Sequence, residues 1–235
     1  VLVRDTVAAE FLKTCGSIGQ IAVEHLDVTC PRTLEGKFTG SVAVVNLVSI
    51  LCESRRQRFN AINIIGASAV AMEAKRARIP TLIHVSALGV EQTARNTAYG
   101  RSKLTGETTV REAYSQAVIL RPSLIVGPED GFFQRFARMS LISPILPLIG
   151  GGRTLFQPAL VDDVAKAISA AIRSPQARGK TFSLVGPTVY SFRDLMQQMN
   201  QITNRSPWMI SLPFWLAALK ARFLSFISHI TPWPP

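Results

Sequence analysis

Three residues that can move protons lie close together in SALGVEQTARNTAYGRSK, residues 86–103. Tyr99 and Lys103 are four positions apart, so they project from one face of the helix that this stretch predicts. Ser86 ends the preceding apolar segment, at the edge of a parallel sheet where ligands bind. A nearby ammonium lowers the pKa of a phenol, which lets the tyrosine exchange a proton with a carbonyl oxygen that the serine orients. The pattern predicts Ser86, Tyr99 and Lys103 as a catalytic set.

A second interpretation of the same residues stays open. A tyrosine and a lysine at this spacing also occur on solvated helix faces, and Ser86 alone could cap a strand. The surrounding strands favour a nucleotide site, in which a bound cofactor would carry the hydride.

The elements that must position these residues alternate along the chain. Apolar segments predict strands, longer amphipathic segments predict helices, and the apolar segments are continuous rather than alternating. Continuous apolar strands are typical of a parallel sheet with helices on both faces. The sequence therefore predicts an α/β fold with a Rossmann-type doubly wound parallel sheet. The expected strands are 1–5, 21–27, 43–48 and 81–86, the segment 117–126 is expected to hold a strand and its exit, and the expected helices are 58–78 and 98–113.

The pattern loosens after Gly127, which predicts a nucleotide-binding domain over 1–127 and a smaller C-terminal lobe over 128–235, interleaved with the first. In this lobe GPEDGFFQRFARM predicts a helix and SPILPLIGGG a connection without regular structure. FQPALVDDVAKAISAAI predicts a short strand and a helix capped by Asp162 or Asp163, and TFSLVG predicts another strand. SFRDLMQQMNQI predicts a helix capped by Ser191.

A glycine-rich phosphate turn is missing from this sequence. The only candidate, Gly16 and Gly19 in CGSIGQ, follows a helical segment and precedes a strand, which is the wrong order for such a turn. We therefore expect the first strand, its glycine turn and the first helix to lie upstream of Val1. We also expect the chain to continue beyond Pro235.

Composition narrows the class of protein. The 235 residues are 47% hydrophobic and 17% charged, which predicts a folded core rather than disorder. The net charge is +11, yet the basic residues are scattered without interleaved aromatics, so no nucleic-acid partner is expected. Three cysteines without a CxxC pattern predict neither a disulfide framework nor a zinc site, and they favour a reducing compartment. The sequence contains no run of 18 uncharged apolar residues, so no membrane span is predicted.

Several longer phrases resemble a known superfamily. HVSALG, the tyrosine–lysine helix, LRPSLIVGPED and FNAINIIGASAVAMEA are similar to motifs of the extended and atypical short-chain dehydrogenase/reductases, which include NAD-dependent epimerases and dehydratases. VVNLVSILCESRRQRFNAIN and SPILPLIGGGRTLFQPALVDDVAKAI resemble the accessory subunits of this type in respiratory complex I, NADH:ubiquinone oxidoreductase, and their alphaproteobacterial relatives. The similarity runs over essentially the whole chain.

The resemblance implies a bound nicotinamide nucleotide. Arg4 stands where relatives choose between cofactors and can pair a 2′-phosphate, so NADP(H) is favoured, while the adjacent Asp5 keeps NAD(H) possible. Relatives more often carry glycine at Ser49, whose side chain is expected to crowd the ribose. Asp27 and Asn46 could instead satisfy turn backbones, and Arg4 could be a solvated edge residue. The implied cofactor-binding residues are Arg4, Asp27, Val28, Asn46, Leu47, Val48, Ser49, Ser86, Tyr99, Lys103, Pro122, Ser123, Leu124 and Ile125.

The resemblance also implies a role. It points to an accessory or assembly subunit of complex I that keeps its nucleotide for structure, bound peripherally on the cytoplasmic or matrix face of the energy-transducing inner membrane and not secreted. A free-standing NAD(P)-dependent oxidoreductase, epimerase or dehydratase is the alternative, and whether the site turns over stays open. The apolar stretch SLPFWLAALKARFLSFISHITPWPP suggests contact with membrane lipid, or else a cover for the domain's own core.

Overall fold

The computed structural model describes residues 1–213 and 215. They form two compact units, each made of two segments of the chain. Unit 1 comprises 1–122 and 164–184, and unit 2 comprises 123–163 and the residues from Val185 onward. The expected division after Gly127 stays a prediction about domains. In the C-terminal apolar stretch that is expected to contact lipid, residues 214 and 216–235 lie outside the described residues.

Unit 1 is built on a parallel sheet of four strands in the order β10-β5-β4-β3. The pairing is in simple register, for example Val44 with Leu82 and Ile83 with Val118. This sheet and its covering helices confirm the predicted Rossmann-type α/β class. The strands are β3 (Val44–Asn46), β4 (Leu82–Val85), β5 (Val118–Pro122) and β10 (Thr181–Leu184).

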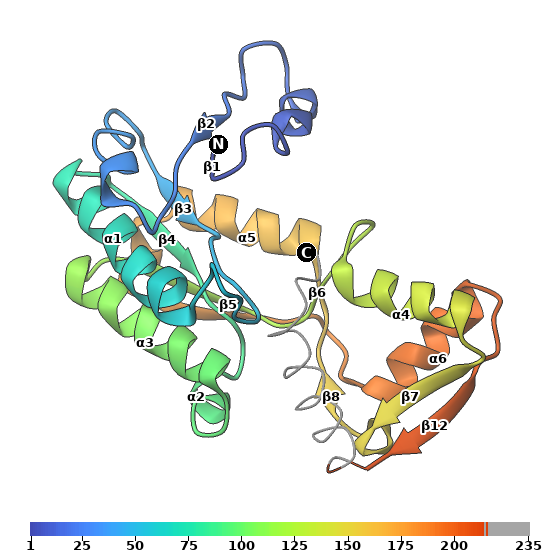
Figure 1. Cartoon of the computed structure of the whole chain (residues 1–235). Coiled ribbons are helices and arrows are strands. Elements are labelled where there is room, and N and C mark those ends of the chain that lie inside the picture. The colour runs from blue at the N-terminus through green and yellow to red at the C-terminus, as the bar shows by residue number, and fades with distance from the viewer. Residues whose placement is uncertain (214, 216–235) are drawn as a thin grey trace. The chain divides into compact units, whose positions relative to one another are not determined.

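Helices cover both faces of this sheet (Figure 1). Leu82 and Ile119 face a core shared with α1 and α3, which lie side by side, whereas Ile83 and Val118 face α5. Residues pointing to both faces of β4 and β5 are therefore mostly apolar, as expected for a sheet buried on both faces. The helices are η3 (Asn60–Gly66, a π-helix), α1 (Ala67–Arg76), α2 (Val90–Thr93), α3 (Ala98–Ala113), α5 (Val161–Arg173) and the 3₁₀ turn η5 (Pro175–Ala177).

The first two strands form a sheet of their own. β1 (Leu2–Val3) pairs in parallel with β2 (Glu24–His25), and two 3₁₀ turns, η1 (Glu10–Cys15) and η2 (Pro31–Thr33), lie beside them in sequence. Among the described residues no strand joins β1 to β3.

Unit 2 has an aromatic core. Leu146 and Leu148 of β7 are fully buried in a cluster with residues of α6. Five partly buried phenylalanines pack against this cluster. Its elements are β6 (Ile125–Val126), α4 (Gly131–Ile142), β7 (Ile145–Ile149), η4 (Gly150–Gly152), β8 (Leu155–Phe156), β9 (Ala159–Leu160), β11 (Tyr190–Ser191), α6 (Phe192–Ile202) and β12 (Trp208–Leu212).

Two local predictions in this half of the chain, for SPILPLIGGG and for the cap of α5, were wrong. SPILPLIGGG contains β7, which pairs with β12 in a two-stranded sheet. Both strands of such a sheet are edge strands, and an edge strand can accommodate Pro147, which has no backbone N–H to donate. The segment 117–126, predicted as a strand and its exit, contains β5 and then the two-residue β6, which belongs to unit 2. Asp162 and Asp163 lie inside the first turn of α5, where they favour the helix dipole but do not cap it.

The predicted cap of α6 is confirmed. The Ser191 hydroxyl accepts from the Asp194 amide at 3.1 Å, and the Asp194 carboxylate accepts from the Ser191 amide at 2.9 Å. This reciprocal pair is a capping box. Within the described range, none of the helices is both long and apolar enough to span a bilayer.

Candidate functional site

Lys103 is buried under the end of β4. Its side chain projects from α3, whose first turn is capped by the Thr97 hydroxyl accepting from the Gly100 amide at 3.0 Å. The Lys103 ammonium donates to the Val85 carbonyl at 2.9 Å and to the Ser49 hydroxyl at 3.4 Å. Burial lowers the pKa of Lys103 to about 8, while the negative charge of Glu107 opposes that shift. The lysine therefore ties the helix to two strand ends.

A second charged contact holds α3 to the sheet. Arg121 at the end of β5 donates to both carboxylate oxygens of Glu107, with the shortest distance 2.7 Å, and to Glu91 of α2 at 2.8 Å. The hydrogen bond to Glu107 is the main reason that the pKa of Arg121 is raised. Because the Glu107 side chain is only 6% exposed, this pair acts in a weakly solvated place.

Tyr99 lies in the first turn of α3 and is half-buried beside Phe59, with the ring centroids 6.1 Å apart. Burial raises the pKa of Tyr99, and Lys103 does not counter that shift. The expectation that the lysine lowers the pKa of this tyrosine is therefore wrong for the described geometry. Burial is the cause of the raised pKa, and the Lys103 ammonium donates to the Val85 carbonyl and the Ser49 hydroxyl.

Ser86 is buried, and its hydroxyl has no partner among the described residues. Its amide donates to the Leu120 carbonyl at 2.7 Å, which continues the pairing of β4 with β5 by one residue. An unpartnered buried hydroxyl costs free energy, so such groups need an explanation. A hydroxyl held by the backbone with its hydrogen-bonding capacity unused is suited to a ligand.

Asn63 organises the loop after β3, and sequence reasoning missed it as a site residue. Its side-chain oxygen accepts from the Ser49 hydroxyl and from the Ile50 amide, each at 3.2 Å. Its amide nitrogen donates to the Ser102 hydroxyl at 3.0 Å. A Cβ on Gly106 would lie 2.2 Å from the Asn63 carbonyl, so the close approach of α3 to η3 requires glycine there. The Asn-x-x-Gly spacing of residues 63–66 was the available signal.

His84 is a buried neutral acceptor. Desolvation, strengthened by the charge of Lys103, lowers the pKa of His84 to about 3. Its Nδ1 lies 3.2 Å from the side-chain nitrogen of Asn46, whose oxygen accepts from the Val48 amide at 3.0 Å. Asn46 therefore shapes the turn after β3, as the turn-satisfying alternative expected.

A cavity of about 280 Å³ opens beside these turns in unit 1. Arg4, Asp27, Val28, Val48 and Ser49 line it, all of them implied by the resemblance. The Asp27 carboxylate accepts from the Thr29 hydroxyl at 2.7 Å, and this bond is the main cause of its lowered pKa. The other lining residues are Leu2, Val3, Leu26, Ile50, Gln57 and Ile62, which the sequence reasoning did not select.

Ser49 joins the two groups of residues, since it lines the cavity and contacts Lys103. Its side chain is engaged with Asn63 and Lys103. The structure does not bring every implied residue into unit 1. Leu47 is 63% exposed, Pro122 is buried at the end of β5, and Ser123, Leu124 and Ile125 belong to unit 2. Leu124 packs on the phenylalanine cluster there.

The residues of this cavity in unit 1 fit a nicotinamide nucleotide. Leu2, Leu26, Val28 and Ile62 offer an apolar lining for an adenine, and Arg4 and Asp27 offer charge and polarity for its ribose. The Ser86 hydroxyl, which has no partner among the described residues, is a further group that a ligand could use. In the part of the chain that the structure describes, no group of histidine, cysteine and carboxylate side chains could hold a metal ion.

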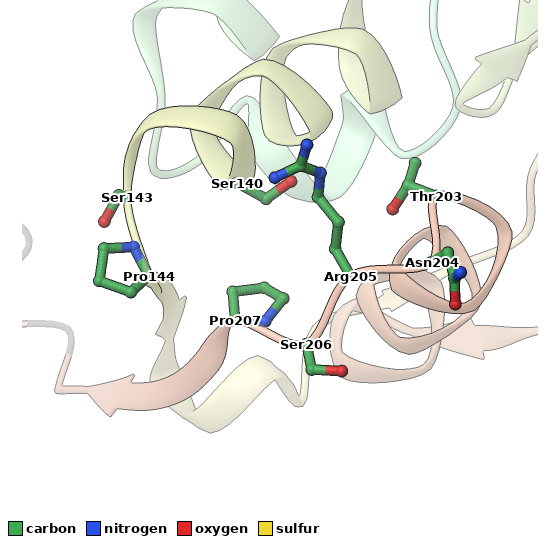
Figure 2. A pocket seen from close by; sticks show the side chains of 8 residues that line it. All are labelled: Ser140, Ser143, Pro144, Thr203, Asn204, Arg205, Ser206 and Pro207. Carbon is green, nitrogen blue, oxygen red and sulfur yellow. The ribbon is translucent and has the colours of Figure 1, made fainter.

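A larger pocket of about 410 Å³ lies in unit 2 and shares no lining residue with the unit 1 cavity. Figure 2 shows the Arg205 side chain reaching across it toward Ser140, between the C-terminal ends of α4 and α6. Helix C-termini carry partial negative charge, so they attract this guanidinium and disfavour an anionic ligand. The remaining lining is Ser143, Pro144, Thr203, Asn204, Ser206 and Pro207.

Comparison with known proteins gives two relatives of different kinds. The chain is 32% identical over 225 residues to the mitochondrial NADH dehydrogenase (ubiquinone) 1 alpha subcomplex subunit 9 of Arabidopsis thaliana, covering 95% of this chain and 56% of that protein. It is 31% identical over 198 residues to a ceramide reductase of Caulobacter vibrioides, covering 83% and 60%. The chain thus spans little more than half the length of these curated relatives.

The fold has a close solved counterpart. The UDP-glucuronic acid 4-epimerase of Bacillus cereus, in complex with NAD, superposes with a TM-score of 0.79 at 18% identity, covering 90% of this chain and 78% of that one. At this identity the likeness shows the fold. A family model described as the NAD dependent epimerase/dehydratase family matches residues 4–185. Because that match takes in most of the chain, together with the tyrosine, the lysine and the strands that position them, the protein belongs to the NAD dependent epimerase/dehydratase family.

Proposed function

We propose that this chain is the nucleotide-binding part of an accessory subunit of respiratory complex I, in which a bound nicotinamide nucleotide serves structure rather than turnover. The observation that carries the proposal is the use of Lys103. Its ammonium donates hydrogen bonds to the Val85 carbonyl and to the Ser49 hydroxyl. Burial raises the pKa of Tyr99. A proton-transfer tyrosine needs the opposite shift.

The nucleotide would be held along the turns that follow the parallel strands. In this proposal the cavity side chains take the adenosine end, with Arg4 beside the ribose and NADP(H) favoured over NAD(H). Tyr99, Lys103 and the free hydroxyl of Ser86 hold the nicotinamide ribose and its surroundings. When bound, the cofactor supplies hydride chemistry. A ligand that binds only the folded state stabilises it, by about 2.7 kcal/mol at 100 times its Kd.

The partner and place follow from the relatives. Proteins similar to this chain are named as mitochondrial subunits of NADH dehydrogenase, so we infer association with complex I, on the cytoplasmic or matrix face of its membrane. Peripheral contact with lipid belongs to the same proposal. It rests on the apolar, weakly charged composition of residues 214–235 and on Trp215, which is 68% exposed. No nucleic-acid partner is proposed.

Native electrophoresis tests the proposal. Membranes containing the full-length protein are solubilised gently, the intact complexes are separated, and this chain is located with an antibody. Co-migration with the complex I band is the expected result. Migration as a small separate species would overturn the subunit assignment and favour a free-standing NAD(P)-dependent oxidoreductase, epimerase or dehydratase. The ceramide reductase relative would then suggest the first substrates to try.

Tyr99→Phe separates holding from turnover. The variant removes the hydroxyl that a proton transfer needs and leaves the half-buried ring in place. We expect unchanged assembly into complex I and a loss of NADP(H) affinity of no more than about tenfold, the value of one hydrogen bond. Tyr190→Phe in unit 2 is the matched control. Loss of a measurable reductase activity in Tyr99→Phe alone would show that the site turns over.

A further inference from the structure

Gln57 makes an unexpected contact at the cavity. In the amide orientation that satisfies both side chains, its oxygen accepts hydrogen bonds from both terminal nitrogens of Arg4, at 2.7 and 2.8 Å. Both residues line the same cavity. The sequence analysis did not predict Gln57 as a site residue. Packing alone does not explain a glutamine here, because its apolar stem is short and its amide faces the charged guanidinium of Arg4.

The acids near Arg4 hydrogen-bond to other groups, although the charge of Arg4 contributes to the lowered pKa of Asp27. Asp5 accepts from the Ala8 amide at 3.0 Å, and Asp27 accepts from the amide and hydroxyl of Thr29 at 2.8 and 2.7 Å. Among the described residues Arg4 forms no ion pair within 4 Å. A neutral amide therefore holds a full positive charge in place, whereas a carboxylate there would neutralise it.

The loop that carries Gln57 is itself braced. The Ser54 amide donates to the Gln57 carbonyl at 2.8 Å, and the Glu53 carboxylate accepts from the Phe59 amide at 2.9 Å. Arg4 lies at the exposed end of a two-residue strand, where an unheld arginine side chain samples many rotamers. Ordering it before a ligand arrives removes part of the entropy cost of binding.

We propose that Gln57 is a positioning residue that sets cofactor choice, by holding Arg4 as a cation without an ion-pair partner among the described residues for the 2′-phosphate of NADP(H). The inference rests on the proposed nucleotide site and adds a specificity determinant to it. Each terminal nitrogen of a guanidinium carries two hydrogens, so one on each remains for a phosphate after Gln57 is bound. NAD(H), which has a 2′-hydroxyl, gains little from this arrangement.

Calorimetric titration of the full-length protein with NADP⁺ and with NAD⁺, at one fixed salt concentration, tests the proposal. Gln57→Glu neutralises Arg4, so the ratio of NADP⁺ to NAD⁺ affinity should fall at least about tenfold. Gln57→Met keeps the length and removes only the acceptor, so a smaller fall is expected. Gln116→Glu, an exposed residue outside the cavity with the same charge change, should keep the wild-type ratio.

The Arg4→Ala background separates positioning from direct repulsion. If Gln57 acts through Arg4, Gln57→Glu should leave the affinity ratio of the Arg4→Ala protein unchanged. A further tenfold fall in that background would overturn the positioning role, because a carboxylate would then be repelling the phosphate directly. An unchanged ratio in Gln57→Glu alone would also overturn it. Failure of the wild-type protein to bind either nucleotide would remove the nucleotide site itself, and the inference with it.

Discussion

The two units bury different kinds of side chain. In unit 1 polar side chains are buried near the ends of parallel strands and on the helices that pack there, whereas the described part of unit 2 buries Ser140 and Asn200 as its polar side chains. Unit 2 is filled instead by aromatic rings, each within 6.3 Å of another ring of the cluster. The buried polar side chains of unit 1 are Asn46, Asn63, Glu73, Thr81, His84, Ser86, Ser102, Lys103 and Glu107.

The contrast distinguishes a unit that buries hydrogen-bonded polar side chains from a unit whose core is mainly aromatic and aliphatic. Burying a polar group is costly unless it is paired, and Lys103, His84 and Asn63 are all paired with neighbours at 3.2 Å or less. Within the described residues the exceptions are the Ser86 hydroxyl in unit 1 and the Asn200 side-chain oxygen in unit 2, and Ser86 belongs to the proposed nucleotide site. The aromatic core of unit 2 is stabilised by burial of apolar surface and by edge-to-face ring contacts, neither of which requires a charged group.

The largest effect should come from breaking the buried charge pair of unit 1. Arg121→Met leaves the Glu107 carboxylate, whose side chain is 6% exposed, without its cation. We expect the free energy of unfolding to fall by about 4 kcal/mol, measured by urea denaturation. Glu91→Gln, which removes the other partner of Arg121, should cost less than about 1 kcal/mol because that side chain is 60% exposed. Equal losses would mean that burial of the pair is unimportant.

The next effect tests unit 2. Phe132 touches four other rings of the aromatic cluster, so Phe132→Ala should lower the free energy of unfolding by about 3 kcal/mol. Nucleotide affinity, measured on the folded protein, should stay within about twofold of the wild type, since the cavity lies wholly in unit 1. Phe11→Ala, at an exposed ring, serves as the control. A large drop in nucleotide affinity for Phe132→Ala would show that the aromatic cluster of unit 2 supports nucleotide binding.

A pH series sharpens the contrast, because the buried histidine is in unit 1. The pKa of His84 is about 3 in the folded chain and 6.5 when unperturbed, so the unfolded chain binds the proton first as the pH falls. Stability is therefore full above pH 6.5 and is lost on the way down to pH 3. The loss should reach about 2 kcal/mol at pH 5. In urea denaturation His84→Gln should flatten this slope, and His25→Gln, at an exposed position, should not.

The smallest effect concerns Ser86, and its sign is the informative part. Ser86→Ala removes a buried hydroxyl that has no partner among the described residues, so the nucleotide-free protein should gain up to about 1 kcal/mol of stability. The same variant should bind NADP⁺ more weakly, by roughly the value of one hydrogen bond. Ser102→Ala is the matched control, because its hydroxyl accepts from Asn63 and its loss should destabilise. A destabilised Ser86→Ala would indicate an internal role for this hydroxyl.

Much of this architecture was predictable from local pattern. The helix over residues 98–113 was predicted with the bounds that the structure has, because its cap and its tyrosine–lysine face are local signals. β7 and β12 were missed because each is a short segment beside prolines, and only their mutual pairing makes them strands. The direction of the Lys103 ammonium and the partners of Gln57 and Asn63 depend on contacts between distant segments, which no spacing encodes.

The edge strand β10 has a consequence for how the chain is made. It pairs with β5 through Thr181 and Ile119, roughly 60 residues apart, and pairings of such sequence separation form slowly. The first segment of unit 2 is synthesised between them. A chain emerging from the ribosome must therefore hold β5 with an open edge until β10 appears, and a pause in translation before residue 181 would prolong that exposure. Synonymous codons around β10, which leave every contact described above intact, could thus alter the yield of folded protein.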